Sequence, residues 1–261
     1  MSAGASNNFM PERRSYPARP RSLESLTHRT PVPDVLQMSP DEAIVSLFQV
    51  AEKKPAMEFQ EFGDLLKLYE LTLADQREAG ARIEVGSTIG ETFASNEIAE
   101  AALSGDGLIY ALPKKAAESL IVVSDVHGHR QGLESAVREF LRDTKSHLAS
   151  LGDNINFGPE QLEVMKALLK LAIQFPKRVH LLRGNNEVDI TRTGGWGDAL
   201  YNAQGERGMK INGDRAERIF SQLPLMLVTE NGLVALHGNL PRAVKEYATD
   251  ETARFRNLQE L

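Results

Sequence analysis

The chain has 261 residues, no cysteine and a formal net charge of −6 at pH 7. This length suits a large α/β domain with an appendage, and the lack of cysteine excludes disulfides, thiolate metal sites and cysteine nucleophiles. The acidic balance argues against a general nucleic-acid-binding protein, and no apolar run reaches the roughly 20 residues of a membrane-spanning helix, so we expect neither a nucleic-acid nor a membrane partner.

Residues 1–37 are predicted to form a disordered, basic and proline-rich tail. Five prolines interrupt any helix in this segment, and five arginines make it locally basic. The tail is interpreted as solvated, and a targeting or docking segment is the alternative. Because the N-terminus lacks the apolar stretch of a secretory signal, we expect a cytoplasmic protein.

Residues 38–115 are predicted to form an N-terminal helical region that packs on the core. Ser39 and Glu42 match a capping box, in which each side chain satisfies a free backbone N–H group of the other residue. Apolar residues then recur at helical spacing as far as Ala51. Three further elements are predicted here: a helix over residues 59–73, a short strand over 82–85 and a short helix over 97–103.

Residues 116–261 are predicted to form the core domain. The run at 120–123 is apolar and rich in β-branched residues, as in a buried parallel strand. Strand patterns then alternate with helical patterns, which indicates a layered βαβ sheet that is covered on both faces. The expected strands are 120–123, one ending near 151, 179–182, 225–228 and 233–236, and the expected helices are about 133–141, one that starts after 159, and 214–223.

Polar clusters with metal-ligand residue types follow four of these strands. Ligands bind beyond the carboxyl ends of the strands in such a sheet, and alternation along an extended backbone would point Asp125 and His127 the same way. Each cluster is common by itself, but their recurrence at one edge of one sheet favours a metal site. The clusters are Ser124-Asp125-Val126-His127-Gly128, Gly152-Asp153-Asn154, Arg183-Gly184-Asn185-Asn186-Glu187 and Leu236-His237-Gly238-Asn239.

In order and spacing these motifs resemble the calcineurin-like metallophosphoesterases, and within them the phosphoprotein phosphatase family of serine/threonine phosphatases. The resemblance covers residues 121–241, a little under half of the chain. The family reads Gly-Asp-x-His-Gly, Gly-Asp-x-Val-Asp-Arg-Gly, Arg-Gly-Asn-His-Glu and His-Gly-Gly at the four places. The resemblance implies a metallophosphoesterase-like α/β fold, with the N-terminal helices as a leader before it.

The resemblance also implies two divalent metal ions and their ligands. Asp125 and His127 would hold one ion, Asn185 and His237 the other, and Asp153, as a catalytic residue, would bridge both. Oxygen and nitrogen ligands suit manganese, iron or zinc equally well. The implied activity is hydrolysis of phosphomonoesters by a metal-activated water, with a phosphorylated protein or a small phosphoester as the substrate.

Three positions depart from the family pattern. Asn186 stands at the place of the catalytic histidine that protonates the leaving group, and Asn156 at the place of the acid that orients it. Loss of a general acid typically costs about 10²–10⁴ in rate. Phe157 replaces an arginine that grips phosphate, and Arg183 or Arg192 is a candidate replacement, with an ordinary surface or strand-end arginine as the alternative reading of either.

The family's last metal-binding histidine has no counterpart, since no histidine follows His237. Either the chain is a truncated form that lacks the C-terminal part of the β-sandwich, or the fold has decayed into a binding scaffold. The first functional hypothesis is therefore a metal-dependent phosphoesterase, and the alternative is a catalytically impaired pseudophosphatase that binds phosphoproteins or partners. A third hypothesis is a dinucleoside polyphosphate hydrolase, which residues 158–164 resemble.

Overall fold

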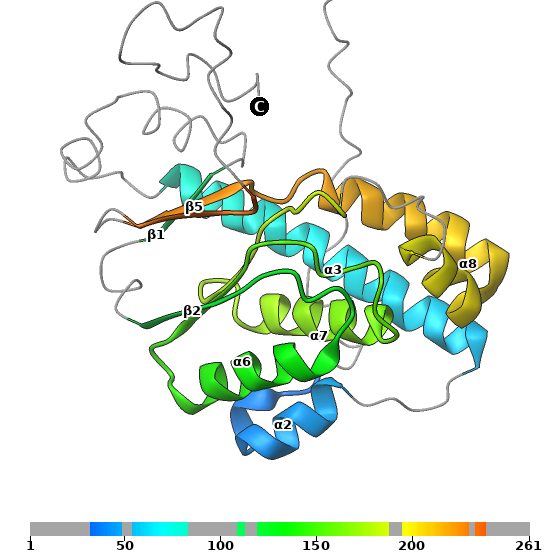
Figure 1. Ribbon diagram of the computed structural model, residues 1–261, viewed down its shortest axis with the longest axis horizontal. Coiled ribbons are helices and arrows are strands. Elements are labelled where there is room, and N and C mark those ends of the chain that lie inside the picture. The colour runs from blue at the N-terminus through cyan, green and yellow to red at the C-terminus, as the bar shows by residue number, and fades with distance from the viewer. Residues whose placement is uncertain are drawn as a thin grey trace, which may run out of the picture.

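Within the residues that the computed structural model describes, two three-stranded β-sheets form the centre of the protein (Figure 1). These residues are 32–48, 54–82, 109–112, 119–187, 195–229 and 233–238. The first sheet is parallel, in the order β2 (Leu120–Val123), β3 (His147–Ser150) and β4 (Val179–Leu181). In the second sheet, β5 (Met226–Thr229) pairs in parallel with β1 (Ile109–Leu112) and antiparallel with β6 (Val234–Leu236).

The α/β fold class predicted from the sequence is confirmed, but the strands are divided between two sheets where one sheet was expected. One face of the β2-β3-β4 sheet is covered by the second sheet, and a cluster of buried side chains from β1, β3, β5 and the end of β4 fills the space between them. Strand β1 lies in a region where no such strand was predicted. A buried apolar run indicates that a strand is covered on both faces, but not by which element.

Helices cover the other face of the β2-β3-β4 sheet. In α6 (Arg130–Arg142), Leu133, Val137 and Phe140 recur at helical spacing and are fully buried, because α6 lies against β2 and β3. The next helix, α7 (Gln161–Gln174), is buried around most of its surface, since it lies between β4 and the N-terminal helices. The layers are therefore sheet, sheet, helices and again helices.

Of the two N-terminal helices in Figure 1, α2 (Pro40–Leu47) lies at one edge of the molecule, and α3 (Pro55–Arg82) runs across it beside α7 and α8 (Trp196–Phe220). After a short 3-10 turn, η1 (Val35–Gln37), helix α2 begins at Ser39, and the predicted capping box with Glu42 is confirmed. Helix α2 lies against α6. The predicted strand at 82–85 is wrong at its first residue, which ends α3; residues 1–31, 83–85 and 97–103 lie outside the described residues.

Helix α8 (Trp196–Phe220) is much longer than the helix predicted at 214–223. Its interior holds glycines and polar residues that hide the apolar period, and Gly205, with φ +74°, separates two helical halves at a kink. Trp196 at its start packs edge-on against Phe62 of α3, with ring centroids 5.6 Å apart. The buried side of α8 is thus formed by contacts with α3, which are distant in the sequence.

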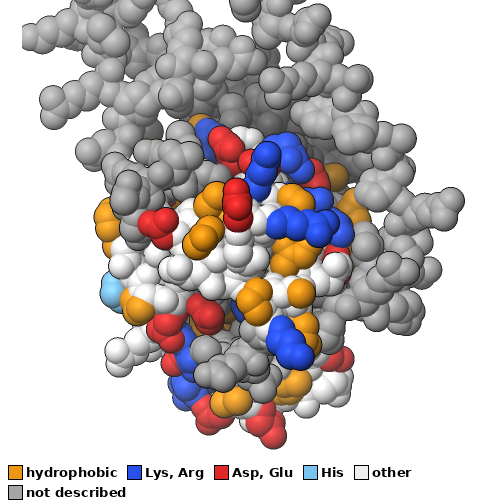
Figure 2. Space-filling view, turned by 90° about the vertical axis from the view of Figure 1, so that its right-hand side faces the viewer, with side chains coloured by type: hydrophobic (Ala, Val, Ile, Leu, Met, Phe, Trp, Pro, Cys, Tyr) orange, Lys and Arg blue, Asp and Glu red, His pale blue; other side chains and the backbone are white. Residues whose placement is uncertain are grey.

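The molecular surface shows no dominance of one kind of side chain on the side turned toward the viewer in Figure 2. Basic, acidic and apolar side chains of the described residues alternate there. None of the helices in the described part of the chain combines the length and the apolar character that a membrane crossing requires.

A buried ion pair joins α3 to α7. Lys166 Nζ lies 2.7 Å from Glu58 Oε1, and the two side chains are only 6% and 9% exposed. We predict that Lys166→Met lowers the free energy of unfolding by about 3–5 kcal/mol, because it leaves the Glu58 carboxylate buried without its partner. Urea denaturation measures this loss. The double variant Glu58→Leu, Lys166→Met should recover most of the stability, and equal instability of the two variants would contradict the prediction.

A histidine pair lies beside the interface of the two sheets. His180 on β4 is buried, its Nε2 lies 3.1 Å from His147 Nδ1, and its ring packs edge-on against Tyr110 of β1. Burial, together with the neighbouring His147, lowers the pKa of His180 from 6.5 to about 3. The folded protein therefore keeps His180 neutral at pH values where the unfolded chain would protonate it.

This difference predicts acid sensitivity of the fold. A histidine whose pKa is lower in the folded state costs nothing at pH 7 and destabilises the fold as the pH falls below 6.5, until both states are protonated. Between pH 7 and pH 5, His180 should remove about 2 kcal/mol from the free energy of unfolding. Denaturation curves at both pH values measure this, and His180→Phe should abolish most of that difference. An unchanged difference in the variant would show that other groups cause it.

Candidate metal centre

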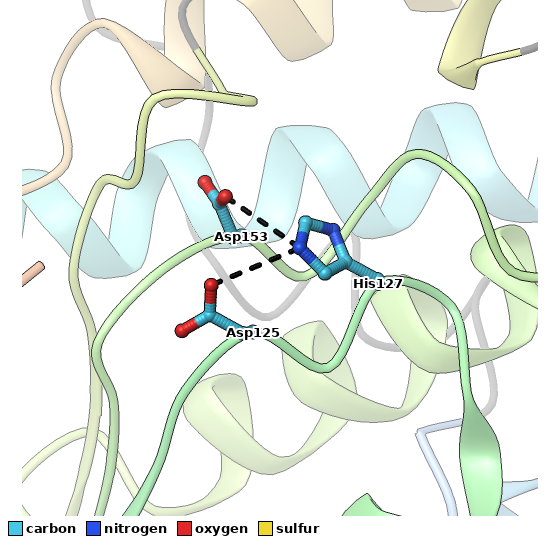
Figure 3. Close-up of side chains that lie close together, drawn as sticks. All are labelled: Asp125, His127 and Asp153. Atoms are coloured by element: carbon cyan, nitrogen blue, oxygen red, sulfur yellow. Dashed lines mark ion pairs between the residues drawn. The ribbon is translucent and has the colours of Figure 1, made fainter. Parts of the chain in front are cut away.

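Two neighbouring loops carry three of the predicted ligands. Asp125 and His127 lie on the loop after β2, and Asp153 lies on the loop after β3. The loops run side by side, because the Asp125 N–H donates to the Gly152 carbonyl (3.1 Å) and the His127 N–H to the Asp153 carbonyl (2.9 Å). Figure 3 shows the three side chains pointing toward one another from these loops.

The backbone of both loops is left-handed at five non-glycine residues. Strand β2 ends at Val123, so the extended backbone that was expected to align Asp125 and His127 is not present. Their side chains converge because both residues have positive φ. Such conformations typically cost about 1–3 kcal/mol each and cluster at functional sites. The five residues and their φ angles are Asp125 (55°), His127 (47°), Asp153 (56°), Asn156 (64°) and Phe157 (71°).

The loop after β4 is held tightly against the loop after β3. Gly152 has φ +109°, and a Cβ atom there would lie 2.2 Å from the Gly184 nitrogen, so only glycine permits this approach. The buried Glu187 carboxylate accepts hydrogen bonds of 2.8 Å from the backbone N–H groups of Asp153, Asn154 and Gly184. Burial raises the pKa of Glu187, and these three hydrogen bonds oppose the rise.

Glu187 is a site residue to which the sequence assigned no role. It links the second and third motifs, because it binds backbone N–H groups of both loops. Its position at the end of the third motif was the only signal that could have identified it.

Asp153 lies between two pairs of side chains. On one side, His127 Nε2 is 3.7 Å from Asp153 Oδ2 and 3.8 Å from Asp125 Oδ1. The ligand atoms of this group all lie within 4.8 Å of one another. On the other side, His237 Nε2 is 3.5 Å from Asp153 Oδ1 and 3.0 Å from Asn185 Oδ1. The two carboxylate oxygens of Asp153 therefore face different pairs of side chains.

The donor atoms of this cluster fit divalent metal ions. His127 Nδ1 lies 3.0 Å from the Ile155 carbonyl, so this nitrogen carries the proton and Nε2 keeps its lone pair for a ligand. His237 Nδ1 is buried without a hydrogen-bond partner among the described residues. The Nε2 atoms of His127 and His237 both face Asp153, and with the oxygens of Asp125, Asp153 and Asn185 they form a set that suits manganese, iron or zinc.

His237 reaches this cluster from the second sheet, directly after β6. The four clusters were predicted at one edge of one sheet, and this detail is wrong. Strand β6 pairs antiparallel with β5 in the second sheet, and the carboxyl end of β6 lies next to the loop after β4. The packing of the two sheets, and not strand pairing within one sheet, brings His237 to Asn185.

Asn186 and Asn156 form a buried hydrogen-bonded pair behind Asp153. Asn186 is 3% exposed, its backbone N–H donates to Asp153 Oδ1 (2.8 Å), and its side-chain amide donates to Asp153 Oδ2. Its own Oδ1 accepts a hydrogen bond from Asn156 Nδ2 (2.9 Å). Asn156 Oδ1 in turn accepts from the Trp196 N–H (2.7 Å). Asn186 therefore orients Asp153.

Of the two arginines predicted to bind substrate, the structure describes only Arg183. Arg183 Nη1 donates to the Ser221 carbonyl at the end of α8 (3.1 Å), and burial lowers the pKa of its guanidinium. Arg192 lies outside the described residues. Phe157, where the family pattern has an arginine, is 66% exposed and packs edge-on against the His127 ring.

Comparisons with known proteins give one family and several phosphatases. The family model described as calcineurin-like phosphoesterase matches residues 119–260. The chain is 28% identical over 174 residues to "Putative serine/threonine-protein phosphatase C27B7.6" of Caenorhabditis elegans, which covers 66% of this chain and 37% of the relative. It is 34% identical over 95 residues to serine/threonine-protein phosphatase BSL2 of Arabidopsis thaliana, or 36% of this chain and 9% of the relative. The chain thus spans well under half the length of these relatives.

A solved structure has a similar fold. It is a protein serine/threonine phosphatase from Saccharomyces cerevisiae with similarity to human phosphatase PP5, at a TM-score of 0.50 and 20% sequence identity. The match covers 69% of this chain and 49% of that one. At this identity the likeness supports the fold alone.

Proposed function

This chain belongs to the calcineurin-like phosphoesterase family, and from that premise we propose that it hydrolyses phosphomonoesters at a centre of two divalent metal ions. The observation that carries the proposal is the position of Asp153, whose two oxygens face different pairs of candidate ligands. A carboxylate in this position can bind two ions at once, an arrangement that stabilises the attacking and leaving oxygens of an in-line displacement at phosphorus.

Each ligand would have a separate task. Asp125 and His127 would hold one ion, Asn185 and His237 the other, and Asp153 both. When bound, two such ions neutralise charge on the phosphoryl oxygens and lower the pKa of a water molecule, so that it can attack phosphorus as hydroxide. Residues of the chain orient these ligands. The Ile155 carbonyl, for example, accepts a hydrogen bond from His127 Nδ1 and so fixes the tautomer of His127.

Asn186 limits this chemistry. Its amide can donate a hydrogen bond, but it cannot release a proton near neutral pH, so it cannot protonate a departing alcohol. Its two hydrogen bonds to Asp153 instead keep that carboxylate oriented. We propose that the enzyme works without a protein-derived general acid.

The buried Asn186–Asn156 pair also supports a second candidate function. A protein that binds metal ions and phosphorylated ligands without turnover would need the same ligand set and no proton donor. In that case the chain would act as a pseudophosphatase, and phosphorylated proteins would be its binding partners.

Metal analysis combined with phosphate release tests the two candidates. The full chain is loaded with Mn²⁺, Fe²⁺ or Zn²⁺, its metal content is measured, and 4-nitrophenyl phosphate is supplied as the substrate. Bound metal together with turnover supports the phosphoesterase, and bound metal with phosphate binding alone supports the second candidate. A chain that binds no metal would overturn both, and faster turnover of dinucleoside polyphosphates than of phosphomonoesters would identify a nucleotide hydrolase instead.

A further inference from the structure

Phe157 is a large apolar residue whose position no folding requirement explains. Its side chain is 66% exposed, so the ring gains little from burial. Its φ of 71° is left-handed, which costs a residue with a Cβ atom roughly 1–2 kcal/mol. A glycine or asparagine would adopt this turn at a lower cost, so neither burial nor backbone conformation accounts for a phenylalanine at this position.

The ring is held next to a proposed metal ligand. It packs edge-on against the His127 imidazole, with ring centroids 5.0 Å apart and an angle of 74° between the rings. The backbone is fixed at the same place, because the N–H of Gly158 donates to the His127 carbonyl (2.7 Å). An apolar face therefore lies at the edge of the candidate metal centre and is open to solvent.

The carboxylates of the centre have no basic partner in the described part of the chain. There, neither Asp125 nor Asp153 forms an ion pair with a lysine or an arginine, and their ionisable neighbours are His127 and His237. A substrate would thus be bound through its phosphate by the ions and through the rest of the molecule by an aromatic surface.

The missing proton donor also favours substrates with an aromatic leaving group. Without a general acid at position 186, the leaving group must depart as an anion. A phenol has a pKa of about 10, whereas the pKa of an aliphatic alcohol is close to that of water, about 16, so a phenolate departs far more readily. Asn186 and Phe157 therefore favour the same class of substrate by independent means.

From these observations we propose that the centre acts on phosphomonoesters of aromatic alcohols, and that Phe157 contacts the ring of the leaving group. In the reaction, the bond between phosphorus and the aryl oxygen breaks as a water oxygen bonds to phosphorus. The phenolate leaves with the bonding electron pair and then takes up a proton from solvent, the attacking water gives up one proton to solvent, and the products are inorganic phosphate and a phenol. This inference rests on the proposed phosphoesterase function. Its substrate is a small aryl phosphate or a phosphotyrosine side chain.

Binding of two non-hydrolysable probes tests the contact apart from catalysis. Phenylphosphonate and methylphosphonate are titrated into the Mn²⁺-loaded full chain by calorimetry. The natural chain should bind phenylphosphonate roughly 3- to 10-fold more tightly, as expected for one aromatic contact. Phe157→Ala should remove this preference. Tyr201→Ala, which removes a 52% exposed aromatic ring from α8, is the matched control and should keep it.

The outcomes separate the two proposals. Equal binding of the two phosphonates by the natural chain, or an unchanged preference in Phe157→Ala, would overturn the aromatic selection and leave the phosphoesterase proposal in place. Binding of neither phosphonate would overturn both.

Turnover then distinguishes the two sources of aryl phosphate. Phenyl phosphate is compared with one peptide that carries either phosphotyrosine or phosphoserine, and kcat/KM is measured for the natural chain and for Phe157→Ala. The ratio of phosphotyrosine to phosphoserine turnover should fall roughly 3- to 10-fold in the variant, a comparison in which intrinsic leaving-group reactivity cancels. A lower KM for the peptide than for phenyl phosphate would identify proteins as the source, and the reverse would identify small molecules. Faster turnover of the phosphoserine peptide would overturn the inference.

Discussion

Asp153→Asn should abolish metal-dependent phosphate release and lower the metal content of the protein. The variant keeps one carbonyl oxygen but loses the second, so residue 153 can no longer bind an ion on each side. Charge stabilisation by metal ions is worth several kcal/mol, and each ~1.4 kcal/mol corresponds to a tenfold change in rate, so we expect a loss of about 10³-fold or more. Metal analysis and the release of 4-nitrophenol measure the two effects.

A matched change elsewhere separates this effect from a general loss of charge. Asp214→Asn makes the same carboxylate-to-amide change on an exposed part of α8 and should leave metal content and turnover unchanged. The fold of Asp153→Asn is checked by circular dichroism, since the remaining oxygen can still accept the Asn186 backbone N–H. Full metal content with natural turnover in Asp153→Asn would exclude Asp153 as the bridging residue.

The double variant Asn186→His, Asn156→Asp should increase the hydrolysis of alkyl phosphates. It replaces the amide pair by a histidine and an acid that orients it, and thereby supplies the proton donor that the chain lacks. A general acid contributes about 10²–10⁴ in rate, so we expect an increase of at least about 10²-fold with an alkyl phosphate. The increase should be smaller with an aryl phosphate, because a phenolate leaves without a proton. Steady-state kinetics with glycerol phosphate and phenyl phosphate measure both values.

The hydrogen bonds around Asn186 and Asn156 are compatible with these two substitutions. Asn156 Oδ1 accepts from the Trp196 N–H, and a carboxylate oxygen can accept the same hydrogen bond. The single variant Asn186→His is the control, and its increase should be smaller because Asn156 would then orient the imidazole without stabilising its charged form. If the double variant binds metal ions but hydrolyses no phosphoester, the result would favour the second candidate function, a pseudophosphatase that binds phosphorylated proteins.

The helices and strands could be predicted where their local pattern is strong. Ser39 and Glu42 identified the start of α2, and the apolar run at 120–123 identified β2. By contrast, α8 was recognised only in its last part, because Gly205, Gly208 and Gly213 interrupt the helical period and its stability comes from packing on α3. Strand β1 was missed for a related reason, since four residues receive their strand conformation from pairing with β5, more than a hundred residues away.

The chemical groups of the candidate centre could be predicted from short sequence motifs. Carboxylate, imidazole and amide side chains follow strands within short motifs, and the missing histidine and arginine at positions 186 and 157 are visible without a structure. How these groups are arranged depends on the folding of distant parts of the chain against one another. The left-handed turns aim Asp125 and His127, the packing of a second sheet supplies His237, and the burial of Asn186 makes it a support for Asp153. Each of these depends on distances between loops that are far apart in the chain, which local sequence patterns do not encode.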